Sequence, residues 1–369
     1  MKVLVTGAKG FIGTHVCEHL KRSHHDVFEF DINDTESTLI EYIQEVDWII
    51  HLAGVNRPLT VEEFYNGNTN FTKKIIDLVK RYHPSVKIIA NSSTQAALDN
   101  DYGKSKKMAE DALISSGLQV YIYRFANVFG RGCRPNYNSA TATFCYNIAH
   151  DLDVFVRDPN YVVNYNYVED IAEELVNLVE NKVNRELSVI LSIKPQYSCT
   201  LGKQVELMKH FKKCVESDEH LPILHDEFEL KLFETFLWYL SDEGSSFNYA
   251  ADERGFFEEL YKSKKHGQIS MNMAYPGICK GGHYHTYKKE IFYPVKGHCV
   301  IRQRNIHNNN MIENDVNDQL TKVNIISEYT HEIKNVGSTN SYTLMWISEV
   351  YHPETHDTYR APVDLKEEE

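Results

Sequence analysis

Two residues capable of acid–base chemistry, Tyr102 and Lys106, lie four positions apart in a segment whose pattern predicts a helix over residues 102–114. On a helix this spacing places both side chains on one face, a turn apart. A tyrosine hydroxyl titrates near about 10, and a neighbouring ammonium should lower that pKa. Such a phenol can exchange a proton with a substrate oxygen near neutral pH. The pair therefore predicts hydride-transfer chemistry on a carbonyl, whose oxygen a hydroxyl of the Ser92-Ser93-Thr94 cluster would bind.

A glycine-rich segment directly follows the first predicted strand, Lys2–Thr6, and opens a predicted helix. Glycines let the backbone approach a pyrophosphate closely, and the helix N-terminus offers free N–H groups and the positive end of its dipole. Asp31, after the second predicted strand, suggests NAD because it can bind a ribose 2′-OH, whereas Lys9 suggests NADP because it can attract a 2′-phosphate. The predicted dinucleotide site consists of Gly7, Lys9, Gly10, Phe11, Ile12, Gly13 and Asp31.

A second candidate site combines imidazoles with a carboxylate. His283 and His285 are two positions apart, so on a strand their side chains point to the same face, and Glu290 can reach them across a turn. His331 lies on a later predicted strand. Two or three imidazoles and one carboxylate suit Zn²⁺, Ni²⁺, Fe²⁺ or Mn²⁺. These four residues are therefore predicted to bind a metal ion.

The composition excludes several classes of protein. A net charge of −13 argues against a nucleic-acid-binding surface, which needs a basic field. The seven cysteines are scattered and never spaced CxxC, so a disulfide framework is not expected and a reducing cytoplasm is. A signal-peptide pattern and an apolar stretch of about 18 residues are both absent from the sequence, so no membrane insertion is expected.

The elements that position these residues change in character along the chain. Over residues 1–125, short apolar strands alternate with helical patterns, which predicts a Rossmann-type, doubly wound parallel sheet covered on both faces. Helices dominate residues 139–240, which would form a small substrate-binding lobe. After a polar run at 241–246, short β-like runs separated by turn residues, Gly281-Gly282 among them, predict an all-β domain. The expected domains are 1–243 and 247–369.

Residues 1–243 resemble the extended short-chain dehydrogenase/reductase family. The glycine loop has that family's GxxGxxG spacing, and further motifs follow in the family's order: His51-Leu52-Ala53-Gly54, Asn91-Ser92-Ser93-Thr94, Tyr102-x3-Lys106, Arg124-Phe125-Ala126-Asn127 and Tyr167-Val168-Glu169-Asp170. The resemblance implies that Leu52, Ala53 and Gly54 line the cofactor and that Lys106 also binds its ribose. It implies Ser93, with Thr94 as the alternative, as the hydroxyl that works with Tyr102.

The resemblance also implies that Asn127 meets a substrate diphosphate. Two departures from the family pattern bear on substrate binding. Only nine positions separate Ser93 from Tyr102, so the connecting loop is short. Val163 stands where the family often has an arginine. A guanidinium that binds the diphosphate must therefore come from another arginine, and the candidates are Arg131, Arg134, Arg124 and Arg157.

The metal-ligand candidates resemble the first motif of the cupin family at every specified position, Gly277-x5-His283-x-His285-x4-Glu290-x6-Gly297. The second motif is degenerate: Glu328 replaces its glycine and Ile326 its proline, whereas His331 and Asn335 fit. This resemblance implies a cupin (jelly-roll) barrel.

An extended reductase fused to a cupin resembles the bifunctional UDP-sugar enzymes of capsular polysaccharide synthesis. The resemblance implies C3 epimerisation of a UDP-2-acetamido-2,6-dideoxy-4-ketohexose in the cupin. NADPH-dependent reduction of its C4 ketone would follow, giving a UDP-N-acetyl-6-deoxy-L-talosamine-type product on the route to UDP-N-acetyl-L-fucosamine. It also implies bound Zn²⁺ and a homodimer.

Two alternatives remain open. The cupin could be a purely structural or dimerising module beside a UDP-4-ketosugar reductase, or the chain could be a non-enzymatic NADP sensor. The Tyr102–Lys106 pair argues against the sensor. The base that would remove the C3 proton is also open, with His352, Tyr287 and His298 as candidates.

Overall fold

The computed structural model describes residues 1–187, 190–216, 222–240, 249–263, 267–317, 321–350 and 357–365. The chain divides into two compact units, Met1–Lys209 with His225–Ser241, and His210–Leu224 with Asp242–Glu369. The predicted boundary at residues 243–247 lies outside the described residues and stays a prediction. The first unit carries the predicted dinucleotide site, and the second carries the predicted metal site.

A parallel sheet forms the centre of the first unit, with the strand order β2-β1-β3-β4-β5-β8. Its inner strands are apolar and buried on both faces, as their sequences predict. The neighbours of β1 are β2 and β3, so the strand order reverses there. Doubly wound sheets generally bind ligands at the carboxyl ends of the strands beside such a reversal. The strands are β1 (Lys2–Thr6), β2 (Asp26–Phe30), β3 (Trp48–His51), β4 (Lys87–Ser93), β5 (Val120–Phe125) and β8 (Ile190–Ser192).

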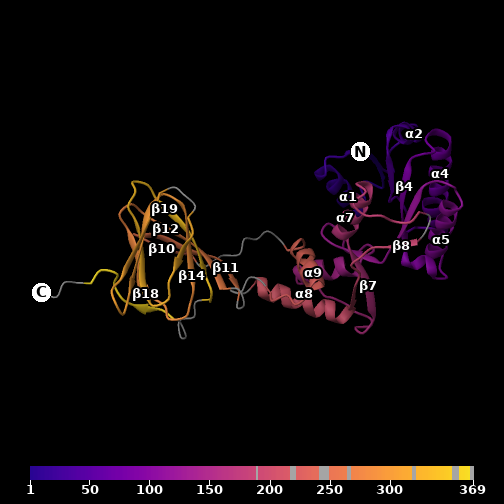
Figure 1. The fold of residues 1–369 in the computed structure, drawn as a ribbon. Coiled ribbons are helices and arrows are strands. Elements are labelled where there is room, and N and C mark those ends of the chain that lie inside the picture. Colours follow the sequence, from indigo (N-terminus) through magenta and orange to yellow (C-terminus); the bar gives the residue numbers. More distant parts are fainter. Residues whose placement is uncertain are drawn as a thin grey trace. The chain divides into compact units, whose positions relative to one another are not determined.

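Helices cover both faces of this sheet, which confirms the doubly wound α/β fold (Figure 1). Leu20 of α1 and Leu175 of α7 belong to the core on one face. Leu39 of α2, Ile76 of α4 and Leu113 of α5 belong to the core on the other. The helices of this layer are α1 (Phe11–Arg22), α2 (Glu36–Glu45), α3 (Val61–Phe64), α4 (Phe71–Tyr82), α5 (Asp101–Ile114) and α7 (Val168–Val179), with a 3₁₀ turn η2 (Thr94–Ala97) before α5.

The segment after β3 is not one continuous α-helix. It is α3, a π-helical stretch η1 (Tyr65–Asn70) and α4 in succession. Gly67 lies in η1, and a Cβ there would approach Val55 Cγ2 to 2.4 Å. The next residue, Asn68, is buried. Its Oδ1 accepts a hydrogen bond from the main-chain N–H of Val55, and its Nδ2 donates one to the main-chain oxygen of Val55. This close polar contact with the loop after β3 accompanies the change in helical geometry.

A smaller lobe contains the sheet β6-β7-β9. Aromatic rings of Phe129, Tyr165 and Phe228 pack together in it. None of the helices that the structure describes has the length and apolar character to cross a membrane. The elements of this region are β6 (Asn127–Phe129), α6 (Ala140–Ala149), β7 (Val162–Tyr167), β9 (Tyr197–Thr200), α8 (Leu201–Val215) and α9 (Glu227–Leu237).

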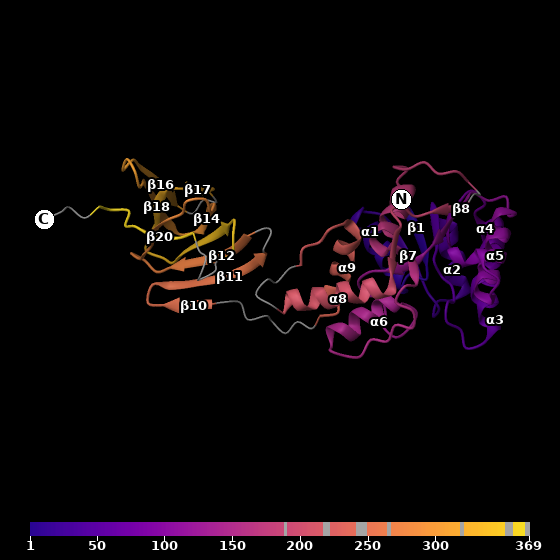
Figure 2. The same cartoon turned by 90° about the horizontal axis from the view of Figure 1, so that it is seen from below.

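The described residues of the second unit from position 249 onward form only β-strands and connecting segments, as predicted. An antiparallel sheet in the order β10-β11-β12-β19-β14-β17 and another in the order β16-β15-β18-β13-β20 enclose a core that includes Phe292, Ile301 and Ile333 (Figure 2). The strands are β10 (Tyr249–Asp252), β11 (Gly255–Ser263), β12 (Gly267–Ala274), β13 (Cys279–Tyr284), β14 (Glu290–Lys296), β15 (His298–Asn305), β16 (Met311–Asn317), β17 (Val323–Ile325), β18 (Tyr329–Asn335), β19 (Ser341–Ile347) and β20 (Tyr359–Arg360).

The Gly281-Gly282 pair lies inside strand β13, so its assignment to a turn was wrong. The register of β13 against β18 shifts between Gly281 and His283, which marks a bulge. Gly281 has φ +121°, and a Cβ on it would lie 2.6 Å from the main-chain oxygen of His331. Only glycine fits there. Because a bulge adds one residue, Lys280 and His283 line the same cavity although three positions separate them.

Candidate functional site

The glycine loop forms a tight cradle between β1 and α1. Gly7 has φ +71°, and a Cβ on it would lie 2.8 Å from Ala53 Cα, in the loop after β3. A Cβ on Gly13 would lie 2.1 Å from the main-chain oxygen of Gly7. Gly10 is the N-cap of α1, so no side chain covers the first N–H groups of the helix, and its first turn carries no acidic residue. This cradle fits a pyrophosphate.

Asp31 lies against the glycine loop. Its Oδ2 accepts a hydrogen bond from the main-chain N–H of Lys9 at 2.8 Å, and its Oδ1 accepts one from Ile32 N–H at 2.8 Å. The side chain of Lys9 is exposed. The two residues that favour NAD and NADP respectively are therefore neighbours.

Gly54 lies close to Asn68 of η1 and to Lys106 of α5. A Cβ on Gly54 would lie 2.7 Å from Asn68 Oδ1 and 3.2 Å from Lys106 Nζ. Asn68 Nδ2 also donates to Ser105 Oγ at 3.0 Å, next to Lys106 on α5. Asn68 thus links the loop after β3, where Leu52, Ala53 and Gly54 lie, to α5. Sequence reasoning missed this asparagine, which lies in η1.

Tyr102 and Lys106 lie on α5 as predicted, and the N-cap Asn100 accepts a hydrogen bond from Gly103 N–H. Lys106 is buried, and burial lowers its pKa to about 8. The negative charge of Glu110 acts to raise this pKa but is outweighed by burial. The expected lowering of the Tyr102 pKa was wrong for the protein without cofactor. Burial raises this pKa above its ordinary value, and a hydrogen bond with Ser93 only opposes the rise.

The contact with Tyr102 distinguishes the two candidate hydroxyls. Ser93 ends β4, is buried, and hydrogen-bonds Tyr102. Thr94 begins η2 and is exposed. The geometry therefore favours Ser93 as the partner of Tyr102, with Thr94 beside it.

Glu110 lies one turn beyond Lys106 on the same face of α5, and sequence reasoning did not select it. Its carboxylate is buried and accepts hydrogen bonds from Ser92 Oγ at 2.6 Å and from Arg124 Nε and Nη2 at 2.8 and 2.7 Å. Arg124 is therefore bound bidentately by protein. The i+4 spacing from Lys106 was the sequence signal that could have identified Glu110.

The residues predicted to bind substrate differ in what they contact. Arg131 is bound by Glu18 at 2.6 Å and Glu169 at 3.0 Å, an arrangement that disfavours a role in diphosphate binding. Exposed Arg134 stacks on the Tyr137 ring at 5.3 Å. Arg57, which sequence reasoning missed, lies 5.7 Å from the same ring.

Two other predicted diphosphate contacts are exposed. Asn127 starts β6 and donates to the main-chain oxygen of Asn164 at 3.3 Å. The remaining candidate, Arg157, is also exposed. The sequence predicted that an arginine would bind the substrate diphosphate. Arg57 and Arg134 fit that role best, because both guanidinium groups lie at the Tyr137 ring and form one positively charged group.

The four predicted metal ligands converge in the second unit. The ligand atoms of His283, His285, Glu290 and His331 all lie within 4.8 Å of one another. Glu290 Oε1 lies 3.1 Å from His285 Nε2, and Oε2 lies 3.3 Å from His331 Nε2. His285, Glu290 and His331 are buried, yet His285 Nε2, Glu290 Oε2 and His331 Nε2 find no well-formed hydrogen bond among the described residues.

The charges and the unused atoms of this cluster fit a divalent metal ion. Burial acts to raise the Glu290 pKa, but His285 and His331 outweigh it and hold that pKa well below its ordinary value. Burial lowers the pKa of His283 to about 3, and nearby His331 adds to the effect. Neutral imidazoles and an ionised carboxylate are the forms that bind metal. Three nitrogens and one carboxylate form a donor set that suits zinc.

Asp357 supports these ligands from a distant part of the chain. Its main-chain oxygen binds His285 Nδ1, and its carboxylate accepts hydrogen bonds from the N–H groups of Thr286, Tyr287 and Lys288. These residues form the turn between His285 and Glu290. Sequence reasoning missed Asp357, for which spacing offers no signal.

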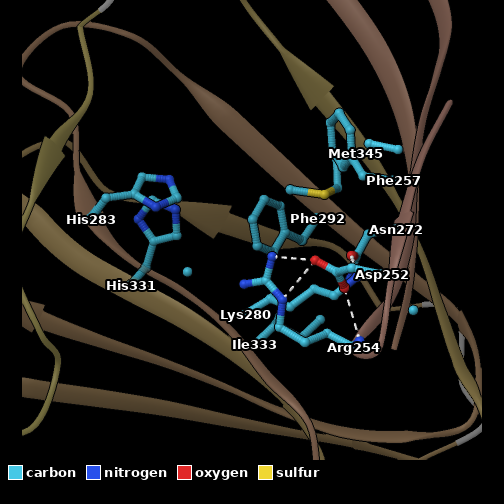
Figure 3. A pocket seen from close by; sticks show the side chains of 13 residues that line it. Asp252, Arg254, Phe257, Asn272, Lys280, His283, Phe292, His331, Ile333 and Met345 are labelled. Carbon is cyan, nitrogen blue, oxygen red and sulfur yellow. Dashed lines mark hydrogen bonds and ion pairs between the residues drawn. The ribbon is translucent and has the colours of Figure 1, made fainter. Parts of the chain in front are cut away.

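A cavity of about 280 Å³ opens beside the metal ligands (Figure 3). His283 and His331 line one part of it, and the polar side chains of Asp252, Arg254, Asn272 and Lys280 line another. Its volume is just below that of most ligand pockets, which run from about 300 to 1,000 Å³.

The cavity does not include the bases predicted for C3 deprotonation. Tyr287 is 58% exposed and His298 pairs with Asp315 at 2.6 Å, and neither lines the cavity formed by the described residues. His352 lies outside the described residues. Lys280, Asn272, Asp252 and Arg254 were not selected from the sequence.

Comparison with known proteins agrees with the division of the chain into two units. A family model described as the NAD dependent epimerase/dehydratase family matches residues 3–191, and one described as a polysaccharide biosynthesis C-terminal domain matches residues 250–359. A UDP-2-acetamido-2,6-beta-L-arabino-hexul-4-ose reductase of Pseudomonas aeruginosa is 36% identical over 371 residues, which cover 98% of this chain and 99% of that protein.

Solved structures give the same result. The crystal structure of the capsular polysaccharide assembling protein CapF from Staphylococcus aureus has a TM-score of 0.82 and 37% identity, covering 98% of this chain and 100% of that one. A UDP-glucuronic acid 4-epimerase from Bacillus cereus, at 17% identity and TM-score 0.56, shares the fold over 65% of this chain and 98% of its own. The chain therefore belongs to the NAD-dependent epimerase/dehydratase family and also carries a polysaccharide biosynthesis C-terminal domain.

Proposed function

We propose that the protein is a bifunctional UDP-sugar enzyme of capsular polysaccharide precursor synthesis. The second unit, as a cupin, would epimerise a UDP-2-acetamido-2,6-dideoxy-4-ketohexose at C3. The first unit would reduce the C4 ketone with NADPH to a UDP-N-acetyl-6-deoxy-L-talosamine-type product, a precursor of UDP-N-acetyl-L-fucosamine. The proposal rests on one observation: the chain combines a Tyr102–Ser93 contact beside a dinucleotide cradle with a buried group of His283, His285, Glu290 and His331.

In the reductase, a bound nicotinamide supplies the hydride. Tyr102 donates its phenolic proton to the C4 oxygen as that oxygen becomes an alkoxide, and Ser93 holds the same oxygen by a hydrogen bond. The raised pKa of Tyr102 supports this direction, because the phenol carries its proton at neutral pH. Lys106, beside Gly54, binds the nicotinamide ribose, and the Gly7–Gly13 loop binds the pyrophosphate.

NADPH is the proposed reductant because exposed Lys9 can reach a 2′-phosphate from the glycine loop. Arg134 and Arg57 are proposed to bind the substrate diphosphate with Asn127, since both guanidinium groups gather at Tyr137 on an exposed surface. Arg131, predicted for the same role, is bound to two carboxylates and is assigned to holding α1 and α7.

In the second unit, His283, His285, Glu290 and His331 would hold Zn²⁺. A metal there would act as a Lewis acid or brace the barrel. A ketone at C4 acidifies the C3 proton, so a base can remove it, and return of a proton to the other face inverts the centre. Reduction of the ketone then removes the acidifying group and fixes the new configuration. The protein is also proposed to act as a cytoplasmic homodimer.

Two variants test the two activities separately. Tyr102→Phe should abolish NADPH oxidation by a UDP-4-ketosugar while the C3 proton still exchanges with deuterated water. The triple variant His283→Ala, His285→Ala, Glu290→Gln should lose C3 exchange and keep NADPH binding. If the triple variant still exchanges the C3 proton, the metal is not needed for epimerisation.

A further inference from the structure

The Lys280 ammonium is a cation held by neutral groups on the wall of the cavity. Its Nζ donates to the main-chain oxygens of Met273 at 2.8 Å and Phe256 at 3.3 Å, and to Asn272 Oδ1 at 3.1 Å. Figure 3 shows Lys280 beside Asn272, across the cavity from His283 and His331. Among the described residues, no carboxylate lies within ion-pair distance of Lys280; the nearby Asp252 is paired with Arg254 at 2.6 Å.

A half-buried cation with only neutral partners lowers stability, because partial burial removes water that its partners do not fully replace. Burial accordingly lowers the pKa of Lys280, and the charge of Asp252 only opposes the shift. Apolar Phe257, Phe292 and Met345 line the same cavity, so an incoming group would meet the ammonium in surroundings of reduced polarity. A cation that the fold leaves uncompensated beside an open cavity is suited to an anionic oxygen.

We propose that Lys280 is a catalytic residue of the second unit, whose ammonium stabilises the oxyanion formed at C4 when a 4-keto sugar loses its C3 proton. In that step the C3–H bond breaks and its electron pair forms the C3–C4 double bond. The π pair of the carbonyl moves to the C4 oxygen, and the proton passes to a general base and exchanges with solvent. The inference rests on the proposed epimerisation and adds the residue that stabilises the negative charge of the C4 oxyanion.

The structure indicates how Lys280 reaches this position. The bulge at Gly281 and Gly282 turns Lys280 to the face that carries His283. The 3.3 Å contact with Phe256 is the longest of its hydrogen bonds and the one that a substrate oxygen would replace. A cavity of about 280 Å³ suits a single sugar ring rather than a whole nucleotide sugar, so the group near Lys280 is the ketosugar.

The test compares Lys280→Met with Lys280→Arg and, as a matched control, Lys334→Met, which changes an exposed lysine on the neighbouring strand β18. The full-length protein is incubated with a UDP-4-ketosugar in deuterated water without NADPH, and C3 exchange is followed by NMR. Zinc content and the melting temperature are measured for every variant, and NADPH oxidation reports the first unit.

Lys280→Met should lower the kcat of exchange about a hundredfold, as removal of one oxyanion-stabilising donor does in other enzymes. Its KM, zinc content and NADPH binding should stay near wild type, and Lys280→Arg should retain more exchange than Lys280→Met. An unchanged kcat would overturn the assignment. So would an increase confined to KM, which would mean that Lys280 binds an anion of the ground state such as the diphosphate.

A folding defect and a missing epimerase activity each have a distinct signature. If Lys280→Met is too unstable to purify, Lys280→Gln and Lys280→Arg are compared instead, and equal exchange rates would overturn a role for the charge. If wild type itself shows no C3 exchange, the proposed epimerisation fails, whereas loss in Lys280→Met alone supports Lys280 on an epimerase.

Discussion

His285 is oriented by Asp357, which lies 72 positions later in the chain. A main-chain oxygen can only accept a hydrogen bond, so the contact makes His285 Nδ1 the donor. In the neutral ring, which is the form that binds metal, Nε2 then has the free lone pair, and it lies 3.1 Å from Glu290 Oε1. The Asp357 carboxylate holds the turn that follows His285. One residue therefore fixes both the ring and the loop between two metal-ligand candidates.

Asp357→Ala should weaken zinc binding by about ten- to a hundredfold, because loss of an outer-shell support has that effect in other metal sites. The main-chain oxygen remains, but the turn over residues 286–288 loses its acceptor. The rate of zinc loss to a chelator measures the effect. Asp315→Ala, an exposed carboxylate of the same unit, is the control and should leave that rate unchanged. Equal rates in the two variants would contradict the role of Asp357.

Glu110→Gln should lower the free energy of unfolding of the first unit by about 2–4 kcal/mol, since it leaves Arg124 without a charged partner and loosens Ser92. Asp111→Asn changes the neighbouring exposed carboxylate, which pairs with Lys107, and should cost less than about 0.5 kcal/mol. Urea unfolding followed by circular dichroism measures both. A cost for Glu110→Gln as small as that of Asp111→Asn would show that the buried pair is not stabilising.

Lys106 should make stability depend on pH. Its pKa is about 8 in the folded protein against an ordinary value of 10.5, so between these values the unfolded chain binds more protons than the folded one. Stability should therefore rise with pH in this window. Relative to Lys106→Met, the cofactor-free wild type should gain about 2 kcal/mol from about pH 7.5 to about pH 9.5. Parallel pH dependences of the two proteins in urea unfolding would rule out the shifted pKa.

Lys9 and Asp31 should have opposite effects on cofactor choice. Lys9→Ala should raise the KM for NADPH about tenfold and leave that for NADH nearly unchanged, because one charge-assisted contact is lost. Asp31→Asn should weaken NADH and improve NADPH, since the carboxylate beside the loop would repel a 2′-phosphate. Steady-state kinetics with both cofactors measure the two variants. Equal effects of Lys9→Ala on both cofactors would contradict NADPH selection by Lys9.

Much of the site was predictable because it depends on short-range patterns. The glycines at positions 7, 10 and 13 and the Tyr102–Lys106 spacing each lie within one turn or loop, so local sequence determines their geometry. His283 in β13 and His285 just after that strand bring their ligand atoms to one site, as two-residue spacing in an extended segment predicts. Glu328, at the position of a motif glycine, has the φ of +62° that glycine favours, so the turn persists although its residue has changed.

Other parts of the site depend on contacts that no local pattern contains. Strict alternation along β13 places Lys280 opposite His283, and only the bulge at Gly281-Gly282 brings them to one cavity. Asp357 and Asn68 act through long-range hydrogen bonds. The Tyr102 pKa was misjudged for the same reason, because burial by the folded chain outweighs the effect of a neighbour on the helix.

The most direct test is NMR of the product made by wild type from a UDP-2-acetamido-2,6-dideoxy-4-ketohexose and NADPH in deuterated water. An enzyme that epimerises at C3 and then reduces C4 gives a product with inverted configuration and deuterium at C3, protium at C4 delivered from NADPH, and no deuterium at C5. A reduced product that keeps its protium and its original configuration at C3 would contradict epimerisation.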